Sequence, residues 1–169
     1  MANVFSLRNL PFELNRWAAL TEFSWHTSPD LSKIAGSGNL SFSVVSLDPG
    51  KYSYPFHFHR NAEELFVILT GKAILRKFNN EFVEIGEHDV LFFGKGQEGA
   101  HQLYNNTGKP CIYLDVRTVN DIDICEYPDT GKIMTLPYLE AFQSDSKVGY
   151  LAGENNVSEK WPRDIIGCK

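Results

Sequence analysis

The chain contains few cysteines and no long apolar run, and these shortages exclude several classes of protein. Three of its 169 residues are cysteine, and no two of them form a C-x-x-C pair. A small, odd number of cysteines is typical of reduced thiols rather than of a disulfide framework. No stretch approaches the ~20 consecutive apolar residues of a membrane span, and no signal-peptide pattern is visible. We therefore expect a cytoplasmic protein without a membrane partner.

Basic residues are also too few and too scattered for a nucleic-acid-binding surface. The sequence has 16 Lys and Arg against 21 Asp and Glu, which gives a formal net charge of −5. Nucleic-acid-binding proteins instead concentrate Lys and Arg in patches. We expect a small molecule, and no nucleic acid, as the ligand.

What the chain does contain is a series of short segments that alternate as β-strands do. Residues 40–47 alternate apolar with small polar side chains, the pattern of a half-buried strand. Further extended segments are predicted over residues 52–59, 64–70, 73–78, 82–85, 90–93, 101–104 and 111–116. Turn residues separate them, and a helical period is almost absent. Many short strands at this spacing predict an all-β sandwich or barrel.

The length predicts one domain, with a flanking segment on each side of the barrel. Residues 1–39 form the expected N-terminal arm, an irregular, apolar segment that packs on the barrel or on a partner subunit, with a short helix around residues 16–22. Residues 40–119 form the barrel, and residues 120–169 form a C-terminal extension that packs on it. Because sheet edges and an apolar arm favour pairing, we expect a homodimer.

Three histidines and a pair of glutamates are the residues most capable of chemistry. His57 and His59 are two positions apart in an extended segment, so their side chains point to the same face. Either Glu63 or Glu64 can project to that face from the next strand, and the spacing leaves the choice open. His101 follows much later in the chain. Imidazole and carboxylate together suit one divalent metal ion, which could be Zn, Mn, Fe, Ni or Cu.

Two segments resemble the paired motifs of the cupin superfamily, in particular its single-domain, uncharacterised bacterial members. The first segment contains Gly50, His57, His59, Glu64 and Gly71, and the second contains Gly86, His101 and Asn105. The first has one extra residue after its first glycine, and the loop before His101 is about two residues longer than is usual in the family. The resemblance implies a double-stranded β-helix, a small jelly-roll barrel, that binds one metal ion per chain. It also implies the ligands His57, His59, Glu64 and His101, and so selects Glu64 over Glu63.

Four other residues are candidates to orient a ligand or to line the pocket. Asn105 shares the strand phase of His101, although an Asn before Asn106-Thr107-Gly108 is equally typical of a turn. Glu63 is the second candidate. Tyr113 and Arg117 belong to a polar stripe on residues 111–117, which we expect on the outer face of its strand. If the stripe faced inward, both side chains could contact a substrate.

Four protein ligands leave one or two positions on a metal ion for water or substrate. We therefore expect a small metalloenzyme, an oxygenase or a sugar or keto-acid isomerase, that acts on a small polar molecule. The alternative is a non-catalytic module that binds or senses a sugar or an anion. The fold does not choose between them, because function belongs to the site.

Overall fold

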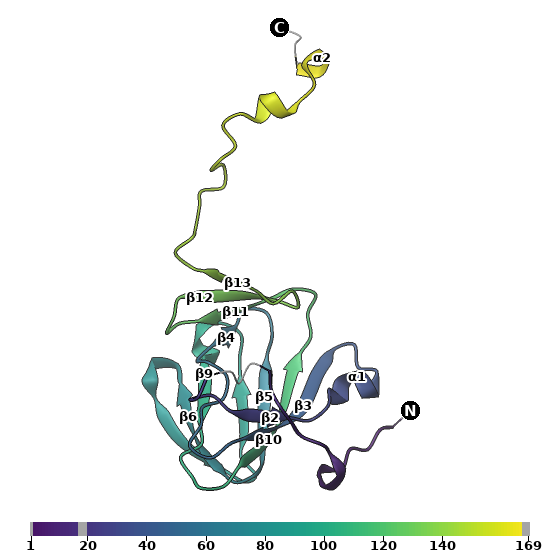
Figure 1. Cartoon of the computed structure of the whole chain (residues 1–169), viewed down its shortest axis with the longest axis vertical. Coiled ribbons are helices and arrows are strands. Elements are labelled where there is room, and N and C mark those ends of the chain that lie inside the picture. The colour runs from purple at the N-terminus through teal and green to yellow at the C-terminus, as the bar shows by residue number, and fades with distance from the viewer. Residues whose placement is uncertain (1, 17–19, 167–169) are drawn as a thin grey trace.

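The computed structural model describes residues 2–16 and 20–166, and its strands form three antiparallel sheets (Figure 1). The six-stranded sheet has the order β1 (Glu13–Leu14), β2 (Trp25–Thr27), β3 (Leu40–Leu47), β10 (Cys111–Thr118), β5 (Glu64–Thr70) and β8 (Val90–Phe93). The three-stranded sheet contains β7 (Phe82–Gly86), β6 (Lys72–Lys77) and β9 (His101–Tyr104). The four-stranded sheet contains β13 (Glu140–Gln143), β12 (Lys132–Leu136), β11 (Asp123–Tyr127) and β4 (Phe58–His59).

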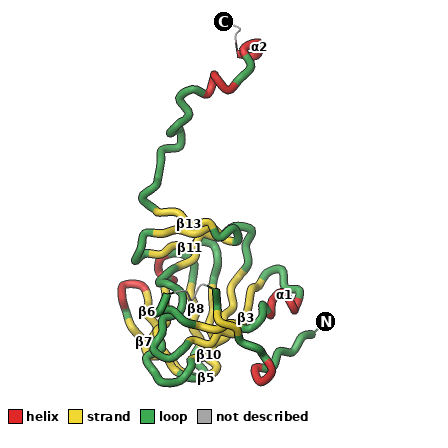
Figure 2. Tube along the Cα trace, viewed as in Figure 1, coloured by secondary structure: helices red, strands yellow, loops and turns green. Residues whose placement is uncertain are grey.

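Helices are few and short in the described part of the chain (Figure 2). They are α1 (Leu31–Ala35), α2 (Arg163–Ile166) and the 3-10 turns η1 (Leu7–Asn9), η2 (Phe78–Asn80), η3 (Gln97–Gly99) and η4 (Val157–Lys160). Helix α1 is capped at both ends, because Asp30 accepts a hydrogen bond from the Lys33 backbone and Gly36 takes the left-handed conformation. None of the described helices has the length and apolar character needed to cross a membrane.

The predicted fold class is confirmed, because the antiparallel sheets form a double-stranded β-helix. Strands β3, β5, β8 and β9 have the predicted bounds, and β6, β7 and β10 differ from them by one or two residues. Within residues 52–59, just Phe58–His59 forms a regular strand, and Tyr52 and His57 make isolated bridges. The alternating segments and the turn residues between them therefore predicted the bounds of most barrel strands.

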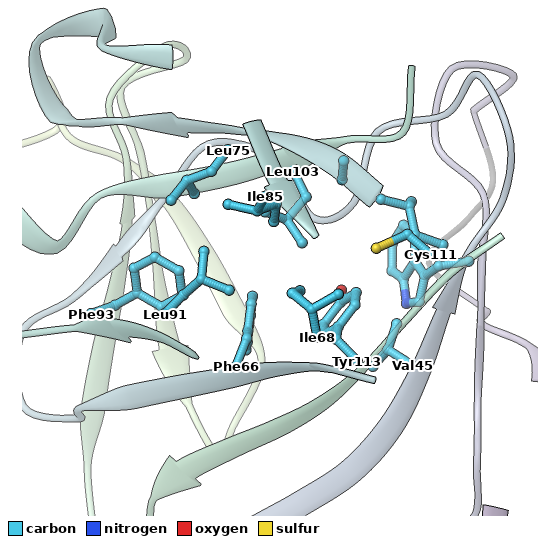
Figure 3. Packing of buried hydrophobic residues seen from close by; sticks show 13 residues of the cluster. Val45, Phe66, Ile68, Leu75, Ile85, Leu91, Phe93, Leu103, Cys111 and Tyr113 are labelled. Atoms are coloured by element: carbon cyan, nitrogen blue, oxygen red, sulfur yellow. The ribbon is translucent and has the colours of Figure 1, made fainter. Parts of the chain in front are cut away.

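The core lies between the six-stranded and three-stranded sheets (Figure 3). Phe66 and Ile68 of β5 and Tyr113 of β10 meet Leu103 of β9 there, and none of these four side chains is more than 1 % exposed. Alternate residues of each strand supply this inner layer. Full burial of each such side chain stabilises the fold by roughly 1.5–3 kcal/mol.

Strand β10 presents its polar stripe to the interior, so the expected outward orientation is wrong. Cys111 and Tyr113 are completely buried, and Arg117 lines an internal cavity. The strand lies between β3 and β5, and its other face carries half-buried apolar residues. Because the outer face is also apolar, alternation alone could not tell inside from outside.

The N-terminal arm adds strands to the barrel. Strand β2 pairs with β3, β1 pairs with β2, and Trp25 is 1 % exposed within the core. The predicted helix around residues 16–22 lies partly outside the described residues, and residues 20–22 are turn and bend. The arm is therefore attached to the barrel mainly through β2.

The C-terminal segment divides into two parts. Strands β11 to β13 pair in sequence, and β11 continues the sheet through β4, so residues 123–143 cover one end of the barrel (Figure 1). The chain after Gln143 then runs away from the barrel (Figure 1). Tyr150 is 98 % exposed and Leu151 is 70 % exposed. These two residues were expected to pack on the barrel, and in this structure they do not.

Candidate metal centre

Backbone pairing brings His57 and His101 together from distant parts of the chain. The two residues form an antiparallel bridge, with the His101 N–H donating to the His57 carbonyl at 2.9 Å and the reverse bond at 3.3 Å. Their ring centroids lie 4.7 Å apart, and those of His57 and His59 lie 5.2 Å apart. Three imidazoles are thus gathered at the mouth of the barrel.

Each of these three rings has its Nδ1 atom beside an acceptor. Nδ1 of His57 lies 2.8 Å from the Pro55 carbonyl, and Nδ1 of His101 lies 2.9 Å from the Gly99 carbonyl. Nδ1 of His59 lies 2.5 Å from the Asp123 carboxylate. Because a carbonyl oxygen can only accept, Nδ1 of His57 and of His101 carries the proton. In a neutral ring, Nε2 then keeps its lone pair for a metal ion.

The carboxylate of Glu64 faces these Nε2 atoms. Its Oε2 lies 3.1 Å from Nε2 of His101 and 3.7 Å from Nε2 of His59. Ligand atoms of His57, Glu64 and His101 all lie within 4.8 Å of one another. Glu64 Oε2 and His101 Nε2 are buried and make no hydrogen bond. Buried polar atoms without partners are costly, and a divalent cation would pair both, so the residues fit a metal ion.

The pKa values favour the protonation states that a metal ion needs. Burial, together with the neighbouring His101 ring, lowers the pKa of His57 to about 3, so this imidazole is neutral at pH 7. Burial opposes ionisation of Glu64, but His101 first, and then His59 and His57, hold its pKa well below its usual range. Neutral imidazole and ionised carboxylate are the metal-binding forms.

Two residues of β11 join the site, although neither was among the site residues predicted from the sequence. Asp123 is 4 % exposed and also accepts a hydrogen bond from the Asn61 N–H at 2.9 Å. Cys125 is the register partner of His59, and its sulfur forms a group with His57 and His59 in which ligand atoms lie within 4.8 Å of one another. Burial raises the pKa of the Cys125 thiol to about 12. Polar and apolar side chains alternate over residues 123–127, and this pattern could have predicted the strand, but it lay beyond the predicted barrel.

Asn105 lies in the turn after β9 and away from the cavity. Its amide donates to the carbonyls of Leu47 and Lys109, and its Oδ1 accepts from the backbone and hydroxyl of Thr107. The side chain is completely buried. Both ends of the amide form hydrogen bonds within the loop. Asn105 is therefore a turn-forming residue, the alternative to a role in orienting a ligand.

The remaining three candidates have different surroundings. Glu63 is exposed and its backbone bonds Thr118, so it is not a pocket residue. Tyr113 is buried in the core against Phe66 and is absent from the cavity wall. Arg117 does line the cavity. Glu63 points outward because its neighbour Glu64 takes the inner face of β5.

A cavity of about 490 Å³ opens from the candidate ligands toward β11, β12 and the N-terminal arm. Its polar wall includes Ser41, Ser43, Asp115, Arg117 and Lys132, and its apolar wall includes Phe23, Trp25, Met134 and Leu136. Tyr127 also lines it, with its ring stacked on His57 at 5.9 Å between centroids. This volume suits a small-molecule ligand.

The fold and the site together define a jelly-roll barrel with a histidine-rich centre at its mouth. Residues 43–117 match the family model described as "Cupin domain". Together with the observed fold, this match identifies a cupin-like domain over residues 43–117 of the chain. No curated protein matches the chain significantly.

Several solved structures have a similar fold. A sugar phosphate isomerase from a cupin superfamily, from Silicibacter pomeroyi, is 18 % identical, with 88 % of this chain and 98 % of that chain covered and a TM-score of 0.74. A predicted oxalate decarboxylase from Thermotoga maritima is 20 % identical, with coverage of 70 % and 100 % and a TM-score of 0.58. The polyketide cyclase RemF from Streptomyces resistomycificus is 20 % identical, with coverage of 71 % and 81 % and a TM-score of 0.57. At these identities the likeness shows the fold alone.

Proposed function

We propose that this protein is a metalloenzyme that acts on a small polar molecule at a centre formed by His57, His59, Glu64 and His101. The observation that carries the proposal is the common orientation of the imidazoles. Each has its Nδ1 beside an acceptor, and the Nε2 atoms of His59 and His101 face the buried carboxylate of Glu64. In a histidine cluster with a purely structural role, we would expect every buried polar atom to have a hydrogen-bond partner.

One divalent ion per chain, which could be Zn, Mn, Fe, Ni or Cu, would act there as a Lewis acid or a redox centre. The protein residues would do the remaining work. Asp123 orients His59, and residues of β11 and β12 form part of the cavity wall. Burial and the charge of Glu64 raise the pKa of Asp115 well above its usual range, so this cavity residue can hold a proton near the centre.

We propose that the enzyme is either an isomerase acting on a sugar or keto acid or an oxygenase. The first has two supporting observations. The wall carries hydroxyl groups and the Asp115 carboxyl group, whose raised pKa suits it to exchange a proton with a substrate. A cupin-fold neighbour is described as a sugar phosphate isomerase. The alternative remains a non-catalytic module that binds or senses a sugar or an anion, and the same cavity would serve it.

Elemental analysis of protein prepared without a metal-affinity tag tests the centre. We expect close to one divalent ion per chain, and a collapse of that content in His57→Ala. Metal-loaded protein is then incubated with a panel of sugars, sugar phosphates and keto acids, while product formation and O₂ uptake are followed. Turnover supports the enzyme. Binding without turnover across the panel supports the sensor, and an unchanged metal content in His57→Ala contradicts the site.

We also propose that the protein is a cytoplasmic homodimer. Both described cysteines, Cys111 and Cys125, are free and buried, which suits a reducing compartment. The outer face of the six-stranded sheet supports pairing. There Phe92 is 63 % exposed and lies in register with Leu65 of β5, which lies in register with Val116 of β10. A sheet that is apolar on both faces is commonly covered on both.

A further inference from the structure

We propose that Arg117 and Lys132 bind the anionic group of the substrate, so that the cavity takes a phosphorylated or carboxylated small molecule. This inference rests on the proposed function, because it specifies the substrate class of the same site. It is supported by two cations that line the cavity from two different sheets, and by the ion pairs that the described residues form.

Arg117 lies next to the candidate metal centre. It is the register partner of Glu64 on one side and of Ser41 on the other. Residues directly opposite in an antiparallel pair share a face, with Cβ atoms roughly 4.5–5.5 Å apart. The half-buried Arg117 side chain lines the cavity from the six-stranded sheet. A substrate that reaches the metal centre therefore passes within reach of its guanidinium group.

Lys132 reaches the same cavity from the four-stranded sheet. It is the register partner of Tyr127, and its ammonium nitrogen lies 4.1 Å from the centroid of the Tyr127 ring. That ring stacks on His57, with 26° between the two planes. Lys132 is thus held in place through Tyr127, which contacts the candidate metal centre.

Among the residues that the structure describes, neither cation forms an ion pair within 4.0 Å, although the charge of Arg117 acts at longer range on the pKa of Asp115. The ion pairs found there involve other lysines and arginines, and those of Arg60, Lys72, Arg76 and Lys77 are examples. The acidic side chains on the described cavity wall are Glu64 and Asp115. Glu64 faces the imidazoles of His59 and His101, and no ion pair within 4.0 Å links Asp115 to Arg117. Shielding unpaired cations from water is costly, and a bound anion would remove that cost.

Guanidinium and ammonium groups recognise the same chemistry in phosphate and in carboxylate. Both anions present several oxygens that accept charge-assisted hydrogen bonds, and Arg binds two of them at once. With the anion held between the two sheets, the rest of the molecule would extend toward Glu64 and the three histidines. The hydroxyl groups of Ser41 and Ser43 would then meet polar groups of the substrate.

Isothermal titration calorimetry with glucose 6-phosphate, gluconate and glucose tests the proposal, on metal-loaded and on metal-free protein. We expect at least one of the two anions to bind at least about tenfold more tightly than neutral glucose, because each charged hydrogen bond is worth more than a neutral one. Arg117→Gln and Lys132→Gln should each weaken that binding by about tenfold or more. Lys72→Gln removes an exposed lysine outside the cavity and should bind as the wild type does.

The arms of the experiment separate the explanations. A preference for glucose 6-phosphate identifies a phosphate site, and a preference for gluconate identifies a carboxylate site. If neither anion binds better than glucose, or if both Gln variants bind as the wild type does, the proposal is wrong and Arg117 instead offsets the negative charge of Glu64, its register partner. Metal content is measured on each sample, so loss of the metal centre is distinguished from loss of the anion site. If Arg117→Gln does not fold, the binding measured for Lys132→Gln, on the half-buried strand β12, tests the proposal.

Discussion

The carboxylate of Asp123 lies 2.5 Å from Nδ1 of His59, although the two residues are 64 positions apart in the chain. The contact forms because β11 pairs with β4, which places Cys125 beside His59, and Asp123 precedes Cys125 by two residues on the same strand. A carboxylate at Nδ1 orients the imidazole and raises its basicity at Nε2. His59 is therefore held in place for metal binding by a strand outside the family-matched residues.

Replacing Asp123 should weaken metal binding without removing a ligand. In Asp123→Asn, the amide can still accept from Nδ1, but the negative charge behind His59 is lost. We expect metal affinity to fall by about 10- to 100-fold, measured by competition with a chelator. Asp121→Asn changes an exposed carboxylate two residues away and should have no effect. Equal affinities in the two variants would contradict a role for Asp123.

Cys125 offers a test of metal preference. Its sulfur is grouped with His57 and His59, so a thiolate-binding ion can recruit it. The Co²⁺-loaded wild type should show a sulfur-to-metal charge-transfer band that Cys125→Ser lacks. Cys111→Ser, a buried thiol in the core, is the matched control and should keep the band. Absence of the band in the wild type would show that Cys125 stays outside the metal coordination.

Acid should destabilise the metal-free protein through His57. Its pKa is about 3 in the folded chain, whereas the ordinary pKa of a histidine is 6.5, so below pH 6.5 the unfolded chain binds a proton that the folded chain excludes. Stability should fall by up to about 1.4 kcal/mol per pH unit between pH 6.5 and 4.5. The pKa values of Asp123 and Glu64 are lowered, so their contributions are lost below that window. Urea unfolding of wild type and His57→Gln should show a shallower pH slope for the variant; equal slopes would contradict the assignment.

The proposed dimer predicts a specific effect of charge on the outer sheet face. Phe92→Glu places a carboxylate on the apolar row formed with Leu65 and Val116, and it should produce monomers in sedimentation velocity experiments. Phe82→Glu is a close control, because Phe82 has the same 63 % exposure but lies on β7 of another sheet. If the wild type is monomeric, or if both variants behave alike, the proposed interface is wrong.

The sequence was sufficient for the barrel strands and for the four candidate ligands. Alternation with period two follows from local backbone geometry, so β3, β5, β8 and β9 could be located without tertiary information. The same geometry places His57 and His59 on one face, and the spacing of the cupin motifs selected Glu64. The structure agrees that Glu64 is buried and Glu63 exposed.

Tertiary structure decided what surrounds those ligands. One face of β10 is buried and the other carries half-buried apolar residues, so the direction of Arg117 depended on which face packs against the rest of the barrel. Cys125 and Lys132 reach the cavity, and Asp123 reaches His59, because β11 pairs with β4 across more than sixty residues of chain. Long-range pairing leaves no local periodic signal. For this reason the sequence predicted the candidate ligands but not the residues that orient His59 and line the cavity.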